Sequence, residues 1–272
     1  DGRPDDLEMR PLASLRRARD GAAIVEFALI APIMTMTLFG LFDVGPGRRI
    51  IGIPGFLIET RSGARILVDT GFPPSYATDP EGTAARDGLP RFGRLVDYSA
   101  RQTAEGQLAL LGLAPRDIAL TILTHGHIDH VGSLPLFAHA PIVLTRTERA
   151  DPQPCYFFEK RPMDWPHAPY VLIGGDTGLC AGLTLLPTPG HTAGHLSVLV
   201  TLPGTGPVIL TGDAINRPSE PDEGYPDARD PALAAGSGDR LMLLREKLGA
   251  MLIYGHCPVQ WTTLRKAPNA YS

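Results

Sequence analysis

Short apolar runs separated by polar turns cover most of the chain from residue 50 onward. Residues 55–71 (GFLIETRSGARILVDTG) hold two such runs around Arg-Ser-Gly, which predicts a β-hairpin. Residues 98–112 and 239–249 carry leucines at helical spacing and predict amphipathic helices. Strands that alternate with helices along a chain indicate a layered α/β domain.

Two further segments, residues 73–93 and 216–238, are rich in proline and glycine and predict long loops. Connections of this length in a compact domain are usually functional or mobile. We therefore expect loops that serve function or motion at both places, not regular structure.

The amino-terminal part of the chain has two competing interpretations. Residues 21–42 are apolar except for Glu26 and follow a basic cluster, so they are long enough for a membrane-spanning helix. Residues 21–32 (GAAIVEFALIAP) also resemble the amino terminus of the tight-adherence pilus pseudopilins. Alternatively, residues 35–45 (TMTLFGLFDVG) alternate toward a turn and predict the first strand of the globular domain.

The two interpretations exclude each other, because a spanning helix would include the residues of the strand. We favour the strand. This choice divides the chain into an N-terminal extension, residues 1–33, and a globular domain, residues 34–272. The extension is then a loose tail or an appended helix. Met34 or Met36 is a candidate natural start, in which case the residues before it are a gene-boundary artefact.

The composition narrows the class of protein. Hydrophobic residues make up 43% of the chain and charged residues 20%, which is ordinary for a soluble globular protein. The net charge of −4 argues against a nucleic-acid partner, because such proteins usually carry a strong basic balance. Three scattered cysteines, Cys155, Cys180 and Cys257, form no CxxC pair and fit a reducing compartment. We therefore expect a cytoplasmic protein, with membrane anchoring through residues 21–42 as the alternative.

Four apolar runs are followed directly by side chains that bind metal ions. The runs and the residues that follow them are 118–124 with His125, His127, Asp129 and His130, 183–190 with His191, 207–212 with Asp213, and 250–255 with His256. If the four runs lie side by side, five histidines and two aspartates meet at one edge of a sheet. Such an edge is a usual place for an active site.

Seven ligands exceed what one zinc ion takes, which is four in a closed structural site and three plus water in a catalytic one. They suit two metal ions that share a carboxylate and a hydroxide and leave positions open for a substrate. The position of Asp213 after an apolar strand favours the shared role, although it could also cap a turn. Histidine and aspartate suit zinc, and iron, cobalt or manganese accept the same set. The pattern therefore predicts a catalytic site with two divalent metal ions.

Other residues have two open interpretations. His195 either supports a ligand from behind or has a structural role, and Asp69 either orients a ligand histidine through its free ring nitrogen or forms a turn. Four aromatic residues either line an apolar substrate pocket or belong to the core. They are Tyr156, Phe157, Phe158 and Trp165.

The motifs HxHxDH at 125–130, TPGHTAGH at 188–195, TGD at 211–213 and GH at 255–256 resemble the metallo-β-lactamase superfamily, over roughly residues 35–272. The resemblance implies a four-layer αββα sandwich with a dinuclear metal site at the strand ends. Within the superfamily the sequence is most similar to the N-acyl homoserine lactonases, the quorum-quenching lactonases. Residues 53–74, 112–137 and 256–272 carry that similarity.

The resemblance also implies roles for the ligands. His125, His127 and His191 would hold the first metal, Asp129, His130 and His256 the second, and Asp213 would bridge them. A metal-bridging hydroxide would then attack the lactone carbonyl, with Asp129 relaying a proton to the leaving oxygen. These lactonases usually carry a tyrosine three residues after the bridging aspartate, where this chain has Asn216. An amide can still donate a hydrogen bond to an oxyanion, but the departure leaves the substrate open.

Three rival functions remain. Phosphotriesterases of the methyl-parathion-hydrolase type share the motif. Thioester hydrolases of the glyoxalase II type share all seven ligands but add a carboxyl-terminal helical domain, whereas 16 residues follow His256 here. A pilus or membrane component rests on residues 21–42 alone. The expected partner is a small lactone or ester, without nucleic acid and with membrane association disfavoured, and a homodimer stays open.

Overall fold

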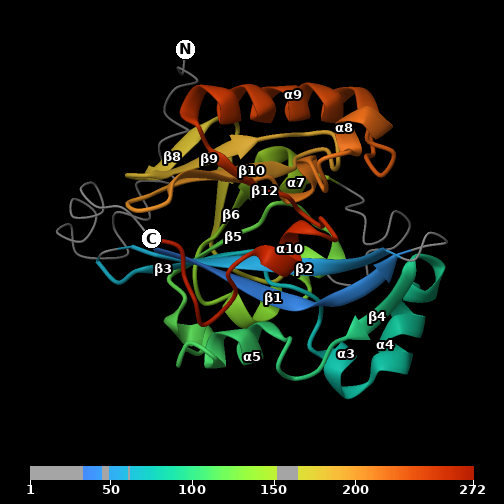
Figure 1. Ribbon diagram of the computed structural model, residues 1–272. Helices are drawn as coiled ribbons and strands as arrows, with labels where there is room; N and C mark the ends of the chain where they lie inside the picture. The colour runs from blue at the N-terminus through green and yellow to red at the C-terminus, as the bar shows by residue number, and fades with distance from the viewer. Residues whose placement is uncertain (1–32, 45–48, 61, 152–164) are drawn as a thin grey trace, which may run out of the picture.

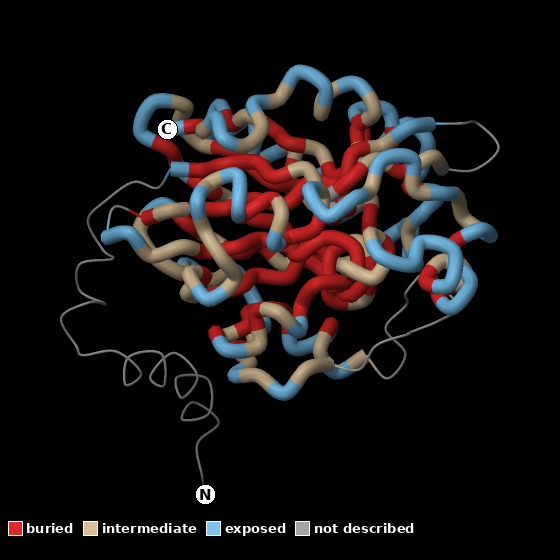
Figure 2. The backbone as a smooth tube through the Cα atoms, turned by 90° about the horizontal axis from the view of Figure 1, so that it is seen from below, coloured by how far each residue is buried: buried red, intermediate tan, exposed pale blue. Residues whose placement is uncertain are grey.

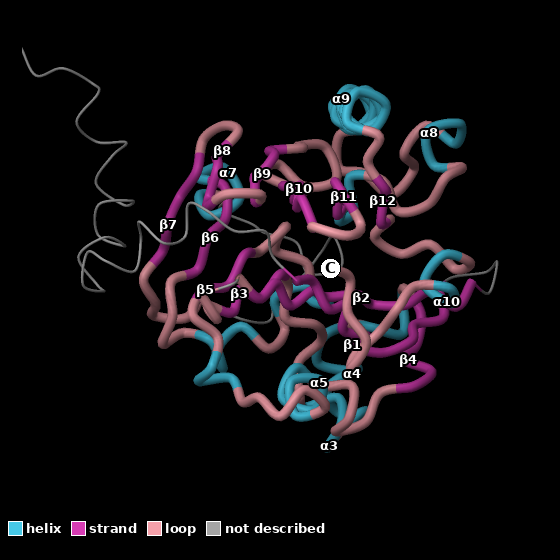
Figure 3. Tube along the Cα trace, turned by 60° about the vertical axis from the view of Figure 1, so that its left-hand side comes forward, coloured by secondary structure: helices cyan, strands magenta, loops and turns pink. Residues whose placement is uncertain are grey.

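Two β-sheets lie face to face in the computed structural model, with helices on both outer sides (Figure 1). The structure describes residues 33–44, 49–60, 62–151 and 165–272. Figure 3 shows the same layers from the side, with α9 outside one sheet and α3, α4 and α5 outside the other. The αββα sandwich expected from the resemblance is confirmed.

The first sheet combines antiparallel and parallel strands. β2 and β3 form the hairpin expected at residues 55–71, with Phe56 opposite Val68 and Glu59 opposite Arg65. From β3 onward the neighbouring strands run parallel. In spatial order the strands are β4 (Gly93–Asp97), β1 (Ile33–Val44), β2 (Arg49–Glu59), β3 (Arg65–Val68), β5 (Leu120–Ile122), β6 (Ile142–Thr145) and β7 (Tyr170–Ile173).

The second sheet is antiparallel except for the parallel pair β11 and β12. In spatial order its strands are β12 (Met251–Ile253), β11 (Gly206–Leu210), β10 (Leu196–Leu202), β9 (Leu183–Pro187) and β8 (Thr177–Cys180). The four runs that precede the metal-binding residues are therefore divided, because β5 belongs to the first sheet and β9, β11 and β12 to the second. The expectation that they line one sheet edge was wrong. Their ligands meet across the facing ends of two sheets.

One apolar core fills the space between the sheets. Phe56 and Ile58 of β2 belong to this core, together with Leu185 and Val198 of the second sheet. Leu57, between them, belongs instead to the core under the helices, because successive side chains of a strand point to opposite faces. Figure 2 shows the buried backbone running through the middle of the molecule with exposed segments around it. The shared core fixes the sheets against each other, and so fixes the loops at their ends.

Helices cover the outer faces of both sheets. Ala234 and Leu241 of α9 pack on the second sheet, and Leu108 of α5 packs on the first. The α-helices are α3 (Ser75–Thr78), α4 (Pro80–Asp87), α5 (Ala104–Ala109), α6 (Ile128–Val131), α7 (Arg146–Ala150), α8 (Glu220–Glu223), α9 (Pro231–Leu248) and α10 (Gln260–Thr263). The 3₁₀ helices are η3 (Leu89–Arg91), η4 (Pro115–Asp117), η5 (Leu134–Phe137) and η6 (Gly212–Ala214).

The prediction of long loops at residues 73–93 and 216–238 was wrong. The first contains α3, α4 and η3, and the second contains α8 and the beginning of α9. The helix expected at 239–249 therefore starts earlier, at Pro231, and the one expected at 98–112 is confined to α5. Pro80 and Pro231 lie at the first positions of α4 and α9, where a missing N–H costs nothing, so they do not break these helices.

The strand expected at residues 35–45 is confirmed as β1. It pairs antiparallel with both β2 and β4, and Met34 also forms a bridge with Tyr271 near the carboxyl end. Residues 21–32, which carry the pilus-like pattern, lie outside the described residues. In the part of the chain that the structure describes, no helix combines the length and apolar character needed to cross a bilayer.

Candidate metal centre

The first four candidate ligands follow β5 of the first sheet. His125 and His127 lie in the loop after the strand, and α6 begins directly after His127. Asp129 and His130 lie on this short helix. The short connection from strand to helix therefore presents all four side chains within one turn of the chain.

The other three candidates come from loops of the second sheet. His191 lies between β9 and β10, Asp213 lies in η6 after β11, and His256 follows β12. These loops approach closely: a Cβ added to Gly255 would lie 2.5 Å from the carbonyl oxygen of Gly212. Glycine at 255 therefore allows the loop of His256 to approach the loop of Asp213.

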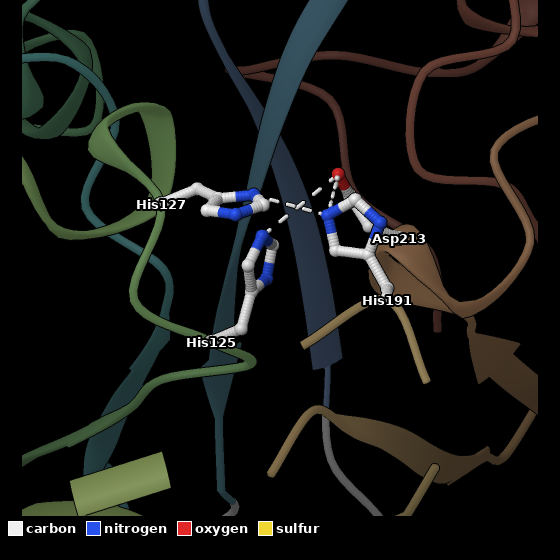
Figure 4. A group of neighbouring side chains, drawn as sticks. All are labelled: His125, His127, His191 and Asp213. Atoms are coloured by element: carbon white, nitrogen blue, oxygen red, sulfur yellow. Dashed lines mark hydrogen bonds and ion pairs between the residues drawn. The ribbon is translucent and has the colours of Figure 1, made fainter. Parts of the chain in front are cut away.

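The seven side chains form two groups. The first ligand group is His125, His127, His191 and Asp213, whose ligand atoms all lie within 4.8 Å of one another. Figure 4 shows its three rings and the carboxylate directed toward one point. His191 Nε2 lies 3.0 Å from His127 Nδ1 and 3.2 Å from Asp213 Oδ2. Ligand atoms of a tetrahedral zinc are about 3.3 Å apart, because each lies about 2 Å from the metal. These spacings suit one metal ion.

The second ligand group is Asp129, His130 and His256. Asp129 Oδ2 lies 3.6 Å from His130 Nε2 and 3.5 Å from His256 Nε2. The group therefore joins two residues of one helix to a histidine from the opposite sheet.

Asp213 lies between the two groups. Its Oδ2 faces the first group, 3.9 Å from His125 Nε2. Its Oδ1 faces the second group, 3.5 Å from His130 Nε2 and 3.2 Å from His256 Nε2. Each carboxylate oxygen can therefore serve a different metal ion.

The chemistry of these atoms fits metal ions. Among the described residues, His125 Nε2, His130 Nε2 and Asp213 Oδ1 are buried and make no hydrogen bond. A buried polar atom without a partner costs about 1–3 kcal/mol. Three such atoms at the points where the groups converge are what ligand atoms facing a cation would show.

Partners behind the rings orient the histidines of the second group. Asp69 Oδ2 lies 2.8 Å from His130 Nδ1, and the carbonyl oxygen of Gly52 lies 3.0 Å from His256 Nδ1. Donation from Nδ1 leaves Nε2 of each ring free to face a metal. Asp69 also accepts from the backbone N–H and hydroxyl of Thr124, and its own backbone is left-handed at φ 60°. Asp69 thus accepts a hydrogen bond from the ring of a candidate ligand histidine, and it does so from a left-handed backbone position.

Both ring nitrogens of His195 form hydrogen bonds with groups other than the candidate ligand atoms. Its Nε2 accepts from the backbone N–H of Asp213 at 3.0 Å, and its Nδ1 lies 2.9 Å from Thr188 Oγ1. Burial lowers the pKa of this ring to about 3, which keeps it neutral. His195 therefore holds the backbone of Asp213 in place.

The two groups differ in electrostatics in the metal-free chain. Burial lowers the pKa of His125 and His191 well below the usual value, and that of His127 to about 4. Burial acts in the same direction on His130 and His256, but the surrounding carboxylates raise their pKa to about 10 and about 9. Burial would raise the pKa of Asp213, yet the neighbouring histidines hold it well below the usual value. The histidines of the first group are thus neutral near pH 7, His130 and His256 of the second group are protonated, and Asp213 is ionised.

Asn216 lies beside this centre, and its side-chain amide forms a hydrogen bond with Glu220. Its Nδ2 donates to Glu220 Oε1 at 3.2 Å, and its backbone N–H also donates to the Glu220 carboxylate. Its backbone carbonyl accepts from the N–H of His256 at 3.2 Å. An amide carries two N–H hydrogens, so one remains beyond the bond to Glu220.

The expected aromatic pocket falls largely outside the described residues. Tyr156, Phe157 and Phe158 are not described, and Trp165 packs against the core cluster around Leu123 and on Tyr170. A cavity of about 800 Å³ does lie between α4, η3 and β4, and none of the seven candidate ligands lines it.

Sequence reasoning missed Glu148, a buried carboxylate behind the first ligand group. It accepts hydrogen bonds from the backbone N–H of Gly126 and of Gly194. The sequence signal was Thr145-x-x-Glu148 at the end of an apolar run, which is a helix-start pattern. That pattern marks the start of α7 but does not reveal which loops the carboxylate reaches.

Residues 53–256 match the family described as the metallo-beta-lactamase superfamily. A second family, described as TadE-like protein, matches residues 21–45. Residues 33–44 of this second match form β1, and residues 21–32 lie outside the described part. A match over so short a segment does not show that the chain belongs to that family.

Curated relatives match most of the chain. An N-acyl homoserine lactonase of Bacillus thuringiensis is 34% identical over 219 residues, which cover 79% of this chain and 84% of the relative. The N-acyl homoserine lactonase AttM of Rhizobium radiobacter is 29% identical over 244 residues, covering 82% and 88%. A solved N-acyl homoserine lactone hydrolase, with the product N-hexanoyl-L-homoserine at its catalytic metal centre, superposes with a TM-score of 0.78 at 27% identity. That likeness covers 89% of this chain and 100% of the other.

Proposed function

This chain belongs to the metallo-beta-lactamase superfamily, and from that premise we propose that it hydrolyses the ring ester of N-acyl homoserine lactones. It is a metal-dependent hydrolase similar to N-acyl homoserine lactonases over most of their length. In this reaction water adds to the ester carbonyl, the ring C–O bond breaks, and the product is the open N-acyl homoserine. Such a reaction quenches quorum signals, the property named for related lactonases.

One observation carries the proposal: Asp213 points one carboxylate oxygen at each ligand group. His125, His127 and His191 would hold one metal ion, Asp129, His130 and His256 the other, and Asp213 would bridge them. Two divalent ions held there would supply Lewis-acid activation of a water molecule and of the ester carbonyl. We propose zinc, because imidazole and carboxylate ligands suit it, while iron, cobalt and manganese accept the same set.

The chain itself relays the proton of the water and supplies polar contacts. The side chain of Asp129 is 14% exposed, against 6% for Asp213, so Asp129 is the carboxylate nearer to the open side. We place the proton transfer to the leaving ring oxygen at Asp129. Asn216 would assist at the carbonyl oxygen through the amide hydrogen that Glu220 does not take.

The test is a hydrolysis panel on protein whose metal content is measured in the same sample. The panel holds N-acyl homoserine lactones, simple γ- and δ-lactones, a glutathione thioester and an aryl phosphotriester. We expect two metal ions per chain and the highest kcat/KM on the acyl homoserine lactones. Faster turnover of the thioester or the phosphotriester would overturn the substrate, and hydrolysis without bound metal would overturn the site.

We also propose a cytoplasmic location, a homodimer and an independent hydrolase domain at residues 34–272. Cysteine usage supports the location, since Cys180 and Cys257 are free thiols. Cell fractionation tests the location and sedimentation tests the dimer. Deletion of residues 1–33 should leave kcat and metal content unchanged if the domain boundary is right.

A further inference from the structure

Glu148 is a buried carboxylate that the proposed reaction does not use. It lies on the first turn of α7 and is 2% exposed. A buried charge is costly unless hydrogen bonds satisfy it, so the partners of this group indicate what it does.

The partners of Glu148 come from the two loops that carry the histidines of the first ligand group. Its Oε1 accepts from the backbone N–H of Gly126 at 2.8 Å, and Gly126 separates His125 from His127. Its Oε2 accepts from the backbone N–H of Gly194 at 2.9 Å and from Thr192 Oγ1 at 2.8 Å. One loop belongs to the first sheet and the other to the second, so the carboxylate spans the gap between them.

α7 is itself held against the loop of His191. The hydroxyl of Thr145 accepts from the N–H of Glu148 at 3.1 Å and donates to the carbonyl oxygen of Gly194 at 2.5 Å. A Cβ added to Gly194 would lie 2.2 Å from the nitrogen of Glu148, so the two segments are in direct contact. The position of Glu148 relative to the His191 loop is therefore fixed by packing as well as by its carboxylate.

The chemistry of this site requires a carboxylate. Three donors reach Glu148 from two directions, and an ionised carboxyl group accepts at both oxygens. Glutamine has one acceptor oxygen, so its NH₂ would face either the N–H of Gly126 or the donors of the other loop. Two donors at about 2.8 Å repel each other, and one loop would move away.

We propose that Glu148 is a positioning residue that sets the separation of the loops of His125, His127 and His191, and thereby the affinity of the metal ion they bind. The inference rests on the proposed metal-dependent function, because it concerns the same centre. It assigns the effect to one of the two metal ions, because the hydrogen bonds that the Glu148 carboxylate accepts from the described residues come from the loops of His125, His127 and His191.

The test is the Glu148→Gln variant, prepared with both metal ions and titrated with a competing chelator. We expect one of the two bound equivalents to weaken by about 10–100-fold, the usual cost of changing a partner behind metal ligands, and the other by less than about threefold. The weakened equivalent should be the one that a His191→Ala variant lacks. Thermal unfolding of the metal-free variant is measured beside it, because a merely structural residue would change that value alone.

Two further variants keep the inference testable. Thr192→Val removes one of the three donors and should weaken the same equivalent by a few-fold, also where Glu148→Gln does not fold. Asp87→Asn is the matched control, since Asp87 is 1% exposed and pairs with Arg86 on α4. It should change thermal stability without changing either metal affinity.

Wild-type affinity for both equivalents in Glu148→Gln and in Thr192→Val would overturn the inference, as would equal weakening of both equivalents. A wild-type protein that binds two metal ions but opens no lactone would overturn the proposed function instead. The chelator titration does not use the reaction, so the two failures are distinguishable.

Discussion

The two ligand groups use the same kinds of side chain but are supported differently. In the second group the support acts on the rings, since Asp69 contacts His130 and the carbonyl of Gly52 contacts His256. In the first group Glu148 acts on the backbone, through the N–H groups of Gly126 and Gly194. One carboxylate therefore fixes ring orientation, and the other fixes loop separation.

The origin of the ligands explains this difference. Asp129 and His130 are neighbours on α6, so their separation is already set by the helix and the remaining freedom is that of the rings. His127 and His191 come from opposite sheets, so the distance between their loops must be set separately. A two-metal centre built between two sheets thus needs both kinds of support.

The largest expected effect comes from a change that disrupts both ligand groups at once. Asp213→Ala removes the one residue shared by both groups and leaves four histidines around it without their common carboxylate. We expect less than one metal ion per chain and a loss of kcat/KM greater than the roughly 100-fold caused by changes behind ligands. Metal analysis and lactone hydrolysis measure both quantities. Two retained metal ions would contradict the bridging role.

A substitution of Asp69, which supports a ring of the second group, tests whether the two groups respond separately. Asp69→Asn would place an amide N–H against Nδ1 of His130 and move the ring hydrogen to Nε2, the nitrogen that faces the metal. We expect one metal equivalent to weaken by about 10–100-fold, and it should be the equivalent that Glu148→Gln leaves intact. Chelator titration of both variants and of their double mutant measures this. Weakening of the same equivalent in both would remove the distinction between the groups.

The pH dependence of the metal-free protein should have opposite signs in the two groups. The pKa values of about 10 for His130 and about 9 for His256 lie above the unfolded value near 6.5. Their stabilisation is therefore complete below about pH 6.5 and is lost as the pH rises through 9–10. The lowered pKa of His127, about 4, has the opposite effect and destabilises the fold as the pH falls from about 6.5 toward 4.

Urea unfolding of the metal-free protein from pH 4 to 10 measures these effects, with His256→Gln as the reference that lacks one raised group. We expect the free-energy difference between wild type and this variant to shrink by roughly 1–3 kcal/mol between pH 7 and 10. A constant difference across that range would refute the contribution of His256.

The smallest effect concerns a residue that serves both groups. Thr124 Oγ1 lies 2.9 Å from Asp69 Oδ2 and 3.0 Å from His125 Nδ1, so it can donate to the carboxylate and accept from the ring. Thr124→Val keeps the shape and removes both bonds. We expect a cost of about 1 kcal/mol, or roughly fivefold in affinity, spread over both metal equivalents. An effect on one equivalent alone, in the same titration, would show that Thr124 belongs to a single group.

The seven candidate ligands could be selected from the sequence because each comes after an apolar run, and strand ends are where a sheet presents side chains to a site. Of the supporting residues, Asp69 and His195 could be named as candidates, because Asp69 also follows an apolar run and His195 shares a motif with His191, whereas Glu148 could not. Glu148 lies 22 residues from Gly126 and 46 from Gly194, and these contacts depend on how α7 packs between two sheets. His195 shares a motif with His191, and its bond to the N–H of Asp213 appears only in the folded chain.

The missed helices show a different limit. Prolines and glycines in residues 73–93 and 216–238 indicated loops, yet several of them mark helix ends. Asp79 and Pro80 begin α4, and Gly88 ends it in a left-handed conformation. The same arrangement occurs in α9, which begins with Asp230 and Pro231 and ends at Gly249. The signals were present, and their order along the chain, with Asp-Pro before and Gly after, was the information that mattered.

Each ligand group takes residues from both sheets, with His125 and His127 opposite His191 in one and His130 opposite His256 in the other. A bound metal ion is therefore a removable cross-link between the two halves of the sandwich. In hydrogen-exchange terms, the loaded protein should open as one cooperative unit, with the amides of β5 and β11 protected to a common level. Chelation should separate those levels and divide one folding unit into two.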